Sequence, residues 1–87
     1  MYADNGDKGD GKMKIIIYSK PDCGACDTTK AWLDSNNLEY TSVDAYEDVD
    51  AFREIKERGF MGFPVVSIND WDKSWSGFDY QRLGELL

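Results

Sequence analysis

The segment YSKPDCGACDT, residues 18–28, joins a short apolar run to an amphipathic one. The apolar run, Ile15–Ile17, is β-branched and predicts a buried strand. The amphipathic run, Cys26–Asn36, predicts a helix, and its inward positions at helical spacing are Cys26, Thr29, Trp32 and Leu33. Cys23 therefore falls at a strand-to-helix turn, and Cys26 follows on the same face. That spacing lets the cysteines close and reopen a disulfide, and a C-x-x-C in this context indicates redox chemistry.

Cys23 is the predicted nucleophile of the pair. Free backbone N–H groups and the helix dipole at the start of a helix stabilise a thiolate. The thiolate attacks a substrate disulfide to form a mixed disulfide, and Cys26, which we expect to be less exposed, then resolves it. Lys20 either helps to hold the thiolate by its charge or is an ordinary solvated lysine. The carboxylates of Asp22 and Asp27 disfavour the thiolate, which favours a more reducing couple.

Two other uses of the cysteine pair lead to different expectations. A structural zinc site needs four nitrogen or sulfur ligands, and a chain with no histidine and two cysteines supplies them only as a dimer. A static disulfide over so short a loop gains little from loop closure. We therefore expect a pair that opens and closes, with no bound metal or other cofactor.

The composition favours one domain in a reducing compartment. The chain has 87 residues, with ten basic and seventeen acidic side chains and a formal charge of −7. This charge argues against binding to nucleic acid or to an anionic membrane surface, and a charged partner should be basic. The sequence shows no apolar segment long enough to span a membrane and no signal peptide. A single close cysteine pair suits the cytoplasm, and we expect a monomer.

The chain is expected to comprise a tail and one domain. Residues 1–12 are rich in Gly, Asp, Asn and Lys and predict a flexible tail, and the domain covers residues 13–87. Strands are predicted at Lys14–Tyr18, Glu39–Val43, Val65–Ile68 and Trp71–Trp75, with a turn at Asn69-Asp70. Helices are predicted after Cys23, from Asp44 to about Arg58, and from Asp79 onward.

Caps and apolar spacing set the predicted limits of the later helices. Asp44 is the expected N-cap of the second helix, with Glu47 three residues later as in a capping box. Gly59 is its expected C′ residue. Asp79 is the expected N-cap of the last helix. The predicted core faces are Val49, Phe52 and Ile55 in the second helix and Leu83, Leu86 and Leu87 in the last.

Several of these segments resemble the glutaredoxins of the thioredoxin superfamily. A strand followed by Tyr-Ser-Lys-Pro-x-Cys-x-x-Cys is most similar to the NrdH-type redoxins, as is the run WSGF at Trp75–Phe78. The resemblance covers about Met13 to Leu87. It implies a thioredoxin-like α/β fold of order β-α-β-α-β-β-α around a central four-stranded mixed sheet.

The resemblance also implies a cis peptide bond before Pro64, with the proline facing the cysteine pair. Such a bond would aim the backbone of Phe63 at the substrate's chain, so that a strand-like pairing forms during exchange. The residues alone favour a trans proline at the start of an edge strand.

Two further segments bear on which molecule reduces the cysteine pair again after it has been oxidised. Glutaredoxins bind glutathione with polar side chains at the places of Phe60 and Met61, which cannot pair with a glycyl carboxylate. The match to the NrdH-type redoxins ends at Asp79, where they have arginine. Asp79 instead resembles a glutaredoxin aspartate at the start of the last helix, where the γ-glutamyl carboxylate would lie, and this keeps glutathione open.

An exposed patch of Phe60, Met61, Phe63 and Trp75 is expected to receive a protein partner. Phe60, Met61 and Trp75 could instead belong to an ordinary core. The full set of candidate substrate- or partner-binding residues is Tyr18, Phe60, Met61, Phe63, Trp75, Ser76, Gly77, Phe78 and Asp79.

These features predict a dithiol-disulfide oxidoreductase with Cys23 and Cys26 as its catalytic residues and Lys20 and Pro64 in support. The resemblance implies an electron donor for ribonucleotide reductase that thioredoxin reductase recharges from NADPH. The alternative among enzymes is a glutathione-dependent glutaredoxin. An alternative of another class is a binding module in which Cys23 and Cys26 hold a metal or an iron–sulfur site across a dimer.

Overall fold

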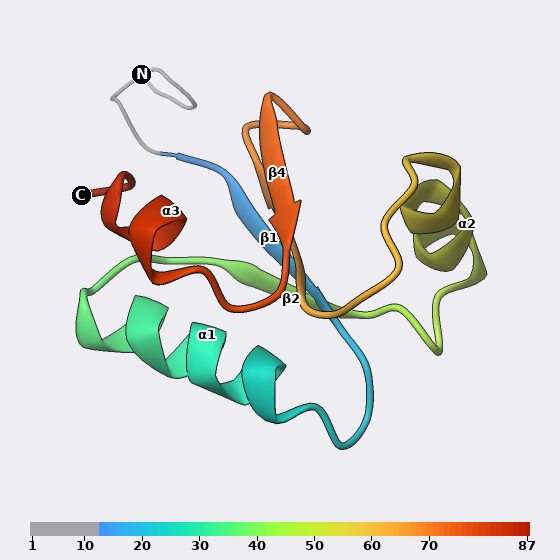
Figure 1. The fold of residues 1–87 in the computed structure, drawn as a ribbon, viewed down its shortest axis with the longest axis horizontal. Coiled ribbons are helices and arrows are strands. Elements are labelled where there is room, and N and C mark those ends of the chain that lie inside the picture. Colours follow the sequence, from blue (N-terminus) through green and yellow to red (C-terminus); the bar gives the residue numbers. More distant parts are fainter. Residues whose placement is uncertain (1–12) are drawn as a thin grey trace.

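The computed structural model describes residues 13–87, which form a sheet with helices on both faces (Figure 1). The elements in chain order are β1 (Ile15–Ser19), α1 (Gly24–Ser35), β2 (Thr41–Asp44), α2 (Val49–Glu57), β3 (Val65–Ile68), β4 (Lys73–Ser76) and α3 (Tyr80–Gly84). This confirms the predicted order, although β2 starts later than predicted. The predicted flexible tail, residues 1–12, lies outside the described residues. No helix within residues 13–87 combines the length and apolar character that crossing a bilayer requires.

The strands are ordered β2-β1-β3-β4 in one four-stranded sheet. β1 is parallel to β2 and antiparallel to β3, and β4 is antiparallel to β3, which confirms the predicted mixed sheet. Ser19 pairs with Asp44, Tyr18 with Val65, and Val65 with Ser76. The ends of β1, β2 and β4 and the start of β3 therefore lie at the same end of the sheet along the strand direction. We call this end of the sheet the cysteine edge. The segments 20–23, 45–48, 63–64 and 77–79 extend from it.

Each face of the sheet has its own core, because side chains alternate along the strands. On one face, α1 and α3 cover a cluster of Ile15, Ile17, Leu33, Val66, Ile68, Trp75 and Leu83. On the other, α2 covers Ala45, Ile55 and Val65, which pack with Tyr18, Phe60, Phe63 and Trp71. Figure 1 shows α1 and α3 on one side of the sheet and α2 on the other. Since both faces are covered, every residue of β3 is buried.

The start of α2 differs from the prediction. The Asp48 side chain caps the helix by accepting from the Ala51 N–H at 3.0 Å. The predicted N-cap, Asp44, and its capping box with Glu47 are therefore wrong. The Asp44 carboxylate instead accepts from the Tyr46 N–H at 2.8 Å, and such a local turn competes with helix formation at that position.

The predicted end of α2 at Gly59 is confirmed. Gly59 has a φ of +87°. Its N–H donates to the Lys56 carbonyl at 3.0 Å, and the Phe60 N–H donates to the Ile55 carbonyl at 3.1 Å. These two bonds form a Schellman motif, whose left-handed residue is usually glycine because glycine has no Cβ to clash. The chain therefore turns directly into the segment before Pro64.

Burial corrects the core faces predicted for the later helices. In α2, Ile55 is buried, whereas Val49 is 71 % and Phe52 38 % exposed. The start of α2 packs against the ring of Tyr46 instead of the sheet, since the Phe52 and Tyr46 ring centroids are 6.0 Å apart. In α3, Leu83 is fully buried and Leu86 half-buried, but Leu87 is exposed.

β4 begins later than predicted, after an extended turn. Asn69, Asp70 and Trp71 have positive φ values of 51°, 57° and 72°, which confirms the turn at Asn69-Asp70 and continues it through Trp71. The Trp71 ring stacks on Tyr18 at a centroid distance of 5.3 Å and lies 4.1 Å from the Arg58 guanidinium carbon. These contacts offset the cost of a left-handed backbone at a bulky residue.

The burial of α3 predicts unequal effects of two leucine truncations. Leu83→Ala removes a side chain with 0 % exposure and should lower the free energy of unfolding by about 2–5 kcal/mol. Leu87→Ala, at 73 % exposure, is the matched control and should change it by less than about 0.5 kcal/mol. Urea denaturation followed by circular dichroism measures both. Equal losses would contradict the assignment of Leu83, and not Leu87, to the core.

Candidate active site

Cys23 and Cys26 form a disulfide at the start of α1, with their Cα atoms 5.2 Å apart. α1 begins at Gly24, directly after Cys23 as predicted, and Cys23 is its N-cap with φ −114° and ψ 101°. The Cys23 Sγ accepts a hydrogen bond from the Cys26 N–H at 3.1 Å. A sulfur atom thus takes the place that a Ser or Asp oxygen commonly fills at a helix start.

This placement distinguishes the two sulfur atoms. The free N–H groups and the positive end of the helix dipole act on the Cys23 Sγ and stabilise a thiolate there after reduction. Cys23 is 9 % exposed and Cys26 only 1 %, which confirms the predicted difference in exposure. An incoming disulfide can therefore reach Cys23 first, whereas the role of Cys26 as the resolving thiol stays a prediction.

Exposed charges flank the cysteine pair. Asp22 has a φ of +57°, a left-handed conformation that Asp adopts more readily than most residues. Lys20 and Asp27 are exposed as well, and the roles of these three charges at the thiolate stay predictions. Within residues 13–87, no three His, Cys, Asp or Glu side chains are grouped as ligands of a metal ion.

The Phe63–Pro64 peptide bond is cis, as predicted. The pairing of Tyr18 with Val65 puts Pro64 beside the end of β1, at the cysteine edge. The Pro64 carbonyl accepts from the Gly77 N–H at 2.8 Å, and Gly77 has a φ of +86° that favours glycine. This bond ties the proline segment to the connection between β4 and α3. That Pro64 faces the disulfide stays a prediction.

An apolar groove lies between α2 and the segment before Pro64. Two adjoining hollows that share Tyr46 and Phe52 form it. The Tyr46 ring contacts Phe52 and Phe63 edge to face, each at a centroid distance of 6.0 Å. The residues that line the groove are Ala45, Tyr46, Val49, Phe52, Ile55, Lys56, Phe60, Met61 and Phe63.

The groove exposes several large apolar side chains. Met61 is 97 % exposed, Val49 71 % and Tyr46 60 %, and contiguous exposed apolar surface commonly marks a binding site. Sequence reasoning missed Tyr46, Val49, Phe52 and Lys56 as site residues. A signal was present, because Val49, Phe52 and Lys56 form one helical stripe that ends in a charged residue and is offset from Ile55.

Other candidate residues are divided between the two faces of the sheet. Tyr18 and Phe60 are half-buried on the α2 face, where they stack on Trp71 at centroid distances of 5.3 and 6.3 Å. Burial, and then the Glu54 carboxylate, raise the pKa of Tyr18 and keep its phenol protonated. Trp75 alternates onto the opposite face and is 7 % exposed in the core there. The predicted exposed patch is therefore wrong at Trp75.

The segment 76–79 continues along the cysteine edge. Ser76 and Phe78 are exposed and Gly77 is half-buried. Asp79 is the N-cap of α3, as predicted, and its carboxylate accepts from the Arg82 N–H at 3.0 Å. The same carboxylate lies 3.5 Å from the Arg82 Nε. The Asp79 carboxylate is therefore engaged by its own helix.

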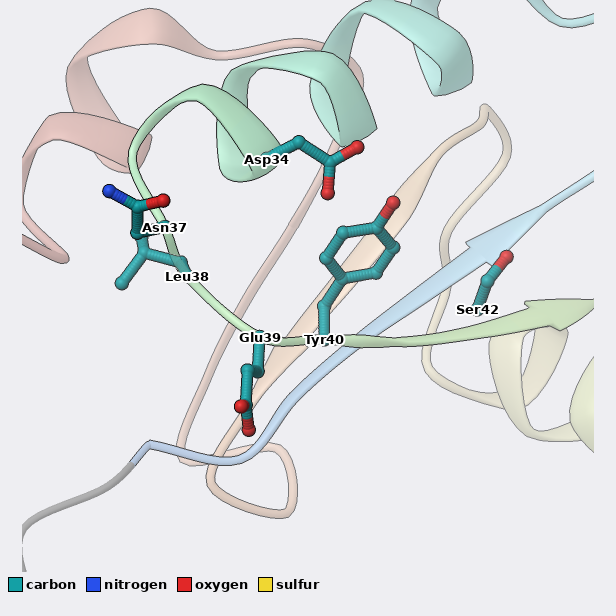
Figure 2. A pocket seen from close by; sticks show the side chains of 6 residues that line it. All are labelled: Asp34, Asn37, Leu38, Glu39, Tyr40 and Ser42. Carbon is teal, nitrogen blue, oxygen red and sulfur yellow. The ribbon is translucent and has the colours of Figure 1, made fainter.

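A polar hollow lies away from the cysteine edge, between the end of α1 and the start of β2 (Figure 2). Its lining residues are Asp34, Asn37, Leu38, Glu39, Tyr40 and Ser42. Figure 2 shows the Tyr40 hydroxyl directed toward the Asp34 carboxylate. Burial, and then this carboxylate, raise the pKa of Tyr40. The apolar groove, and not this hollow, adjoins the disulfide's edge of the sheet.

The cap position of Cys23 predicts the order in which the reduced cysteines react. Iodoacetamide at neutral pH should label Cys23 faster than Cys26, by about tenfold or more, because the Cys23 thiolate is stabilised and less buried. Peptide mass mapping at successive times measures both rates. The Cys23→Ser variant is the control for the intrinsic rate of Cys26. Faster labelling of Cys26 in the unmodified chain would overturn the assignment.

Comparison with known proteins places this geometry in a family. Residues 15–71 match the glutaredoxin family model. The chain is 36 % identical over 74 residues to the glutaredoxin-like protein NrdH of Salmonella typhimurium, which covers 85 % of this chain and 89 % of that protein. Its identity to the NrdH of Escherichia coli K12 is 32 % over 74 residues, with the same coverage.

Comparison with solved structures supports the same family. The NrdH-redoxin structure from Escherichia coli superposes with a TM-score of 0.81 at 28 % identity and covers 85 % of this chain and 95 % of that one. A glutaredoxin from Methanosarcina mazei superposes with a TM-score of 0.70 at 26 % identity and covers 84 % and 76 %. With its disulfide at a helix start on a thioredoxin-like fold, the chain belongs to the glutaredoxin family of thiol-disulfide oxidoreductases.

Proposed function

We propose that the chain reduces protein disulfides, that thioredoxin reductase recharges it from NADPH, and that it supplies electrons to ribonucleotide reductase in the cytoplasm. The observation that carries this proposal is the apolar groove at the cysteine edge, with Met61 97 % exposed. Exposed Met and aromatic side chains favour contact with a protein surface. Glutathione, a tripeptide with two carboxylates, would find few matching groups there.

The charges of the protein also favour a protein reductant over glutathione. The formal charge of −7 repels an anionic tripeptide at a distance. The start of α3, where the resemblance puts the γ-glutamyl carboxylate, already holds the Asp79 carboxylate bound to the Arg82 N–H. The Arg82 N–H is therefore not free to receive a γ-glutamyl carboxylate.

The reduction potential expected from the charges beside the cysteines also favours a protein reductant. Thioredoxin is poised near about −270 mV and glutaredoxins at roughly −200 to −230 mV. Asp22 and Asp27 are exposed next to the cysteines and disfavour the thiolate, which favours the lower potential. The NrdH-redoxin of Escherichia coli has a thioredoxin-like activity profile, and the similarity of this chain to it supports recharging by a protein reductase.

A second candidate, glutathione-dependent reduction, is favoured by one observation. Lys56 lines the groove with Phe60 and Met61, and its Nζ lies 5.6 Å from the centroid of the Phe52 ring. An ammonium at this place could pair with a glycyl carboxylate. Lys56→Gln would then weaken reduction by glutathione more than reduction by a protein partner.

Replacement of each of the two cysteines should stop the reaction at a different step. Cys23→Ser removes the nucleophile and should abolish reduction of an insulin disulfide. Cys26→Ser keeps the attacking thiol but not the resolving one, so the protein should accumulate as a mixed disulfide with its substrate. Turbidity of reduced insulin and non-reducing mass spectrometry measure the two outcomes. Full turnover by Cys23→Ser would refute the proposed order of attack.

The recharging system is tested by direct comparison. The oxidised protein should be reduced by NADPH with thioredoxin reductase and only slowly by millimolar glutathione. NADPH absorbance and thiol trapping follow the two reactions. The proposal fails if glutathione reduces the disulfide efficiently while thioredoxin reductase leaves it oxidised. If both work, Lys56→Gln shows whether the groove cation is responsible.

The groove itself is tested by adding a charge to it. Met61→Glu should lower kcat/KM with thioredoxin reductase by about tenfold, or ~1.4 kcal/mol, because it places a carboxylate in an apolar contact. Leu87→Glu adds the same charge at an exposed leucine after α3 and is the matched control. Equal effects of the two variants would mean that net charge, and not the groove, governs recognition.

A further inference from the structure

The burial of Cys26 creates an electrostatic problem for the resolving step. Only a thiolate attacks a disulfide efficiently, and burial in apolar surroundings disfavours the thiolate. Cys26 is 1 % exposed and lies on the inner face of α1 with Thr29 and Leu33. The N–H of Cys26 is directed to the Cys23 Sγ, so this donor serves the first thiolate. The second thiolate needs another source of positive charge.

Lys30 is the cation that the fold directs to this place. It follows Cys26 by four residues, so the two side chains are neighbours on the helix surface. Helical side chains lean toward the N-terminus of their helix, so Lys30 extends back over the turn that holds Cys26. Lys30 is half-buried, and its Nζ donates to the Ser19 Oγ at 3.4 Å.

Ser19 holds this ammonium at the cysteine edge. It is the last residue of β1 and is 7 % exposed. Its hydroxyl donates to the Val43 carbonyl at 3.5 Å, which leaves its lone pairs to accept from Lys30. The contact therefore keeps the charge of Lys30 at the end of β1, from which the chain turns to the two cysteines.

We propose that the Lys30 ammonium, held by Ser19, stabilises the thiolate of Cys26 and speeds resolution of the mixed disulfide. In that step the Cys26 thiolate attacks the Cys23 Sγ, and the bond between Cys23 and the partner's sulfur breaks. The partner's sulfur leaves as a thiolate and takes up the proton that Cys26 released, so an electron pair passes to the partner. Lys30 acts through its charge and takes no part in the proton transfer. The inference rests on the dithiol exchange and not on which molecule recharges the protein.

Acidic groups around the site act against Lys30 and are the same in every variant compared below. Asp34 is directed to the Tyr40 hydroxyl, and Asp44 accepts from a turn N–H. The charged or titratable groups on Lys30's own helix and on the neighbouring elements are Lys20 and Asp22 in the β1–α1 turn, Asp27 and Asp34 on α1, Tyr40 and Asp44 around β2, and Asp79 with Arg82 on α3.

The first test titrates Cys26 alone. In the Cys23→Ser background, the ultraviolet absorbance of the thiolate is followed against pH. Lys30→Gln should move the midpoint upward by about one pH unit, as expected for loss of a nearby opposite charge. Lys30→Arg should restore the midpoint to within a few tenths of a unit. Lys73→Gln, which removes an exposed lysine on β4, is the matched control and should not move it.

Ser19→Ala provides a milder variant that keeps every charge. Without the hydroxyl, the ammonium is no longer held, and the midpoint should rise by less than in Lys30→Gln. An unchanged midpoint in Lys30→Gln, or an equal shift in Lys73→Gln, would overturn the inference. Circular dichroism of each variant establishes that α1 is folded in the samples compared.

The second test measures the resolving step in the dithiol protein. A one-unit rise in the midpoint lowers the thiolate fraction about tenfold, but the more basic thiolate is about threefold more nucleophilic, so resolution should slow by about threefold. Stopped-flow release of the second chromophoric thiol from an aromatic disulfide measures this rate at neutral pH. Attack by Cys23, seen as release of the first thiol, should stay unchanged. Slowing of both steps alike would contradict a specific role for Lys30. Neither test uses a reductase, so their failure is distinct from failure of the proposed function.

Discussion

The pairing of β1 with β2 on one side and with β3 on the other holds the reactive edge together. Ser19 is fixed against Asp44, and Tyr18 against Val65. A shift by one residue would send Ile17 to the α2 face and Tyr18 into the cluster under α1. Each face has a core of its own, so that shift would disrupt both. The alternation of five strand residues thus fixes where the cysteine turn, the proline segment and the start of α3 meet.

The reactive sulfur atoms and the groove proposed for recognition come from different connections of the fold. The β1–α1 turn supplies the sulfur atoms, whereas the segments on either side of α2 supply the apolar groove. The strand register brings these connections to the cysteine edge. The residues of one connection can nevertheless be substituted independently of the residues of the others. A family can therefore keep one disulfide chemistry and change its partners through the groove. Among the described residues, the groove combines exposed apolar side chains with one lining cation, Lys56, on an acidic protein.

Features that local chemistry determines were predictable from the sequence, whereas distant contacts caused the errors. The cysteine turn and the Asp79 cap each depend on residues within a few positions of one another. Helical spacing groups Val49 with Ile55, but it does not say that the sheet reaches only Ile55. Alternation in β4 assigns Trp75 to a face only once the register with β3 is known. The family resemblance, and not the residues alone, predicted the cis bond at Pro64.

The Cys23 Sγ is both the reacting atom and the cap of α1. After reduction, the same N–H faces a charged sulfur, and charge-assisted hydrogen bonds are about twice as strong as neutral ones. The hydrogen bond that caps α1 is therefore stronger in the dithiol form, where the sulfur is a thiolate, than in the disulfide form. By reciprocity, whatever frays that turn removes stabilisation from the dithiol form and makes the protein a stronger reductant. The reduction potential of the cysteine pair and the stability of the first turn of α1 are therefore thermodynamically linked. A substitution in that turn can change both, even where the side chain does not contact sulfur.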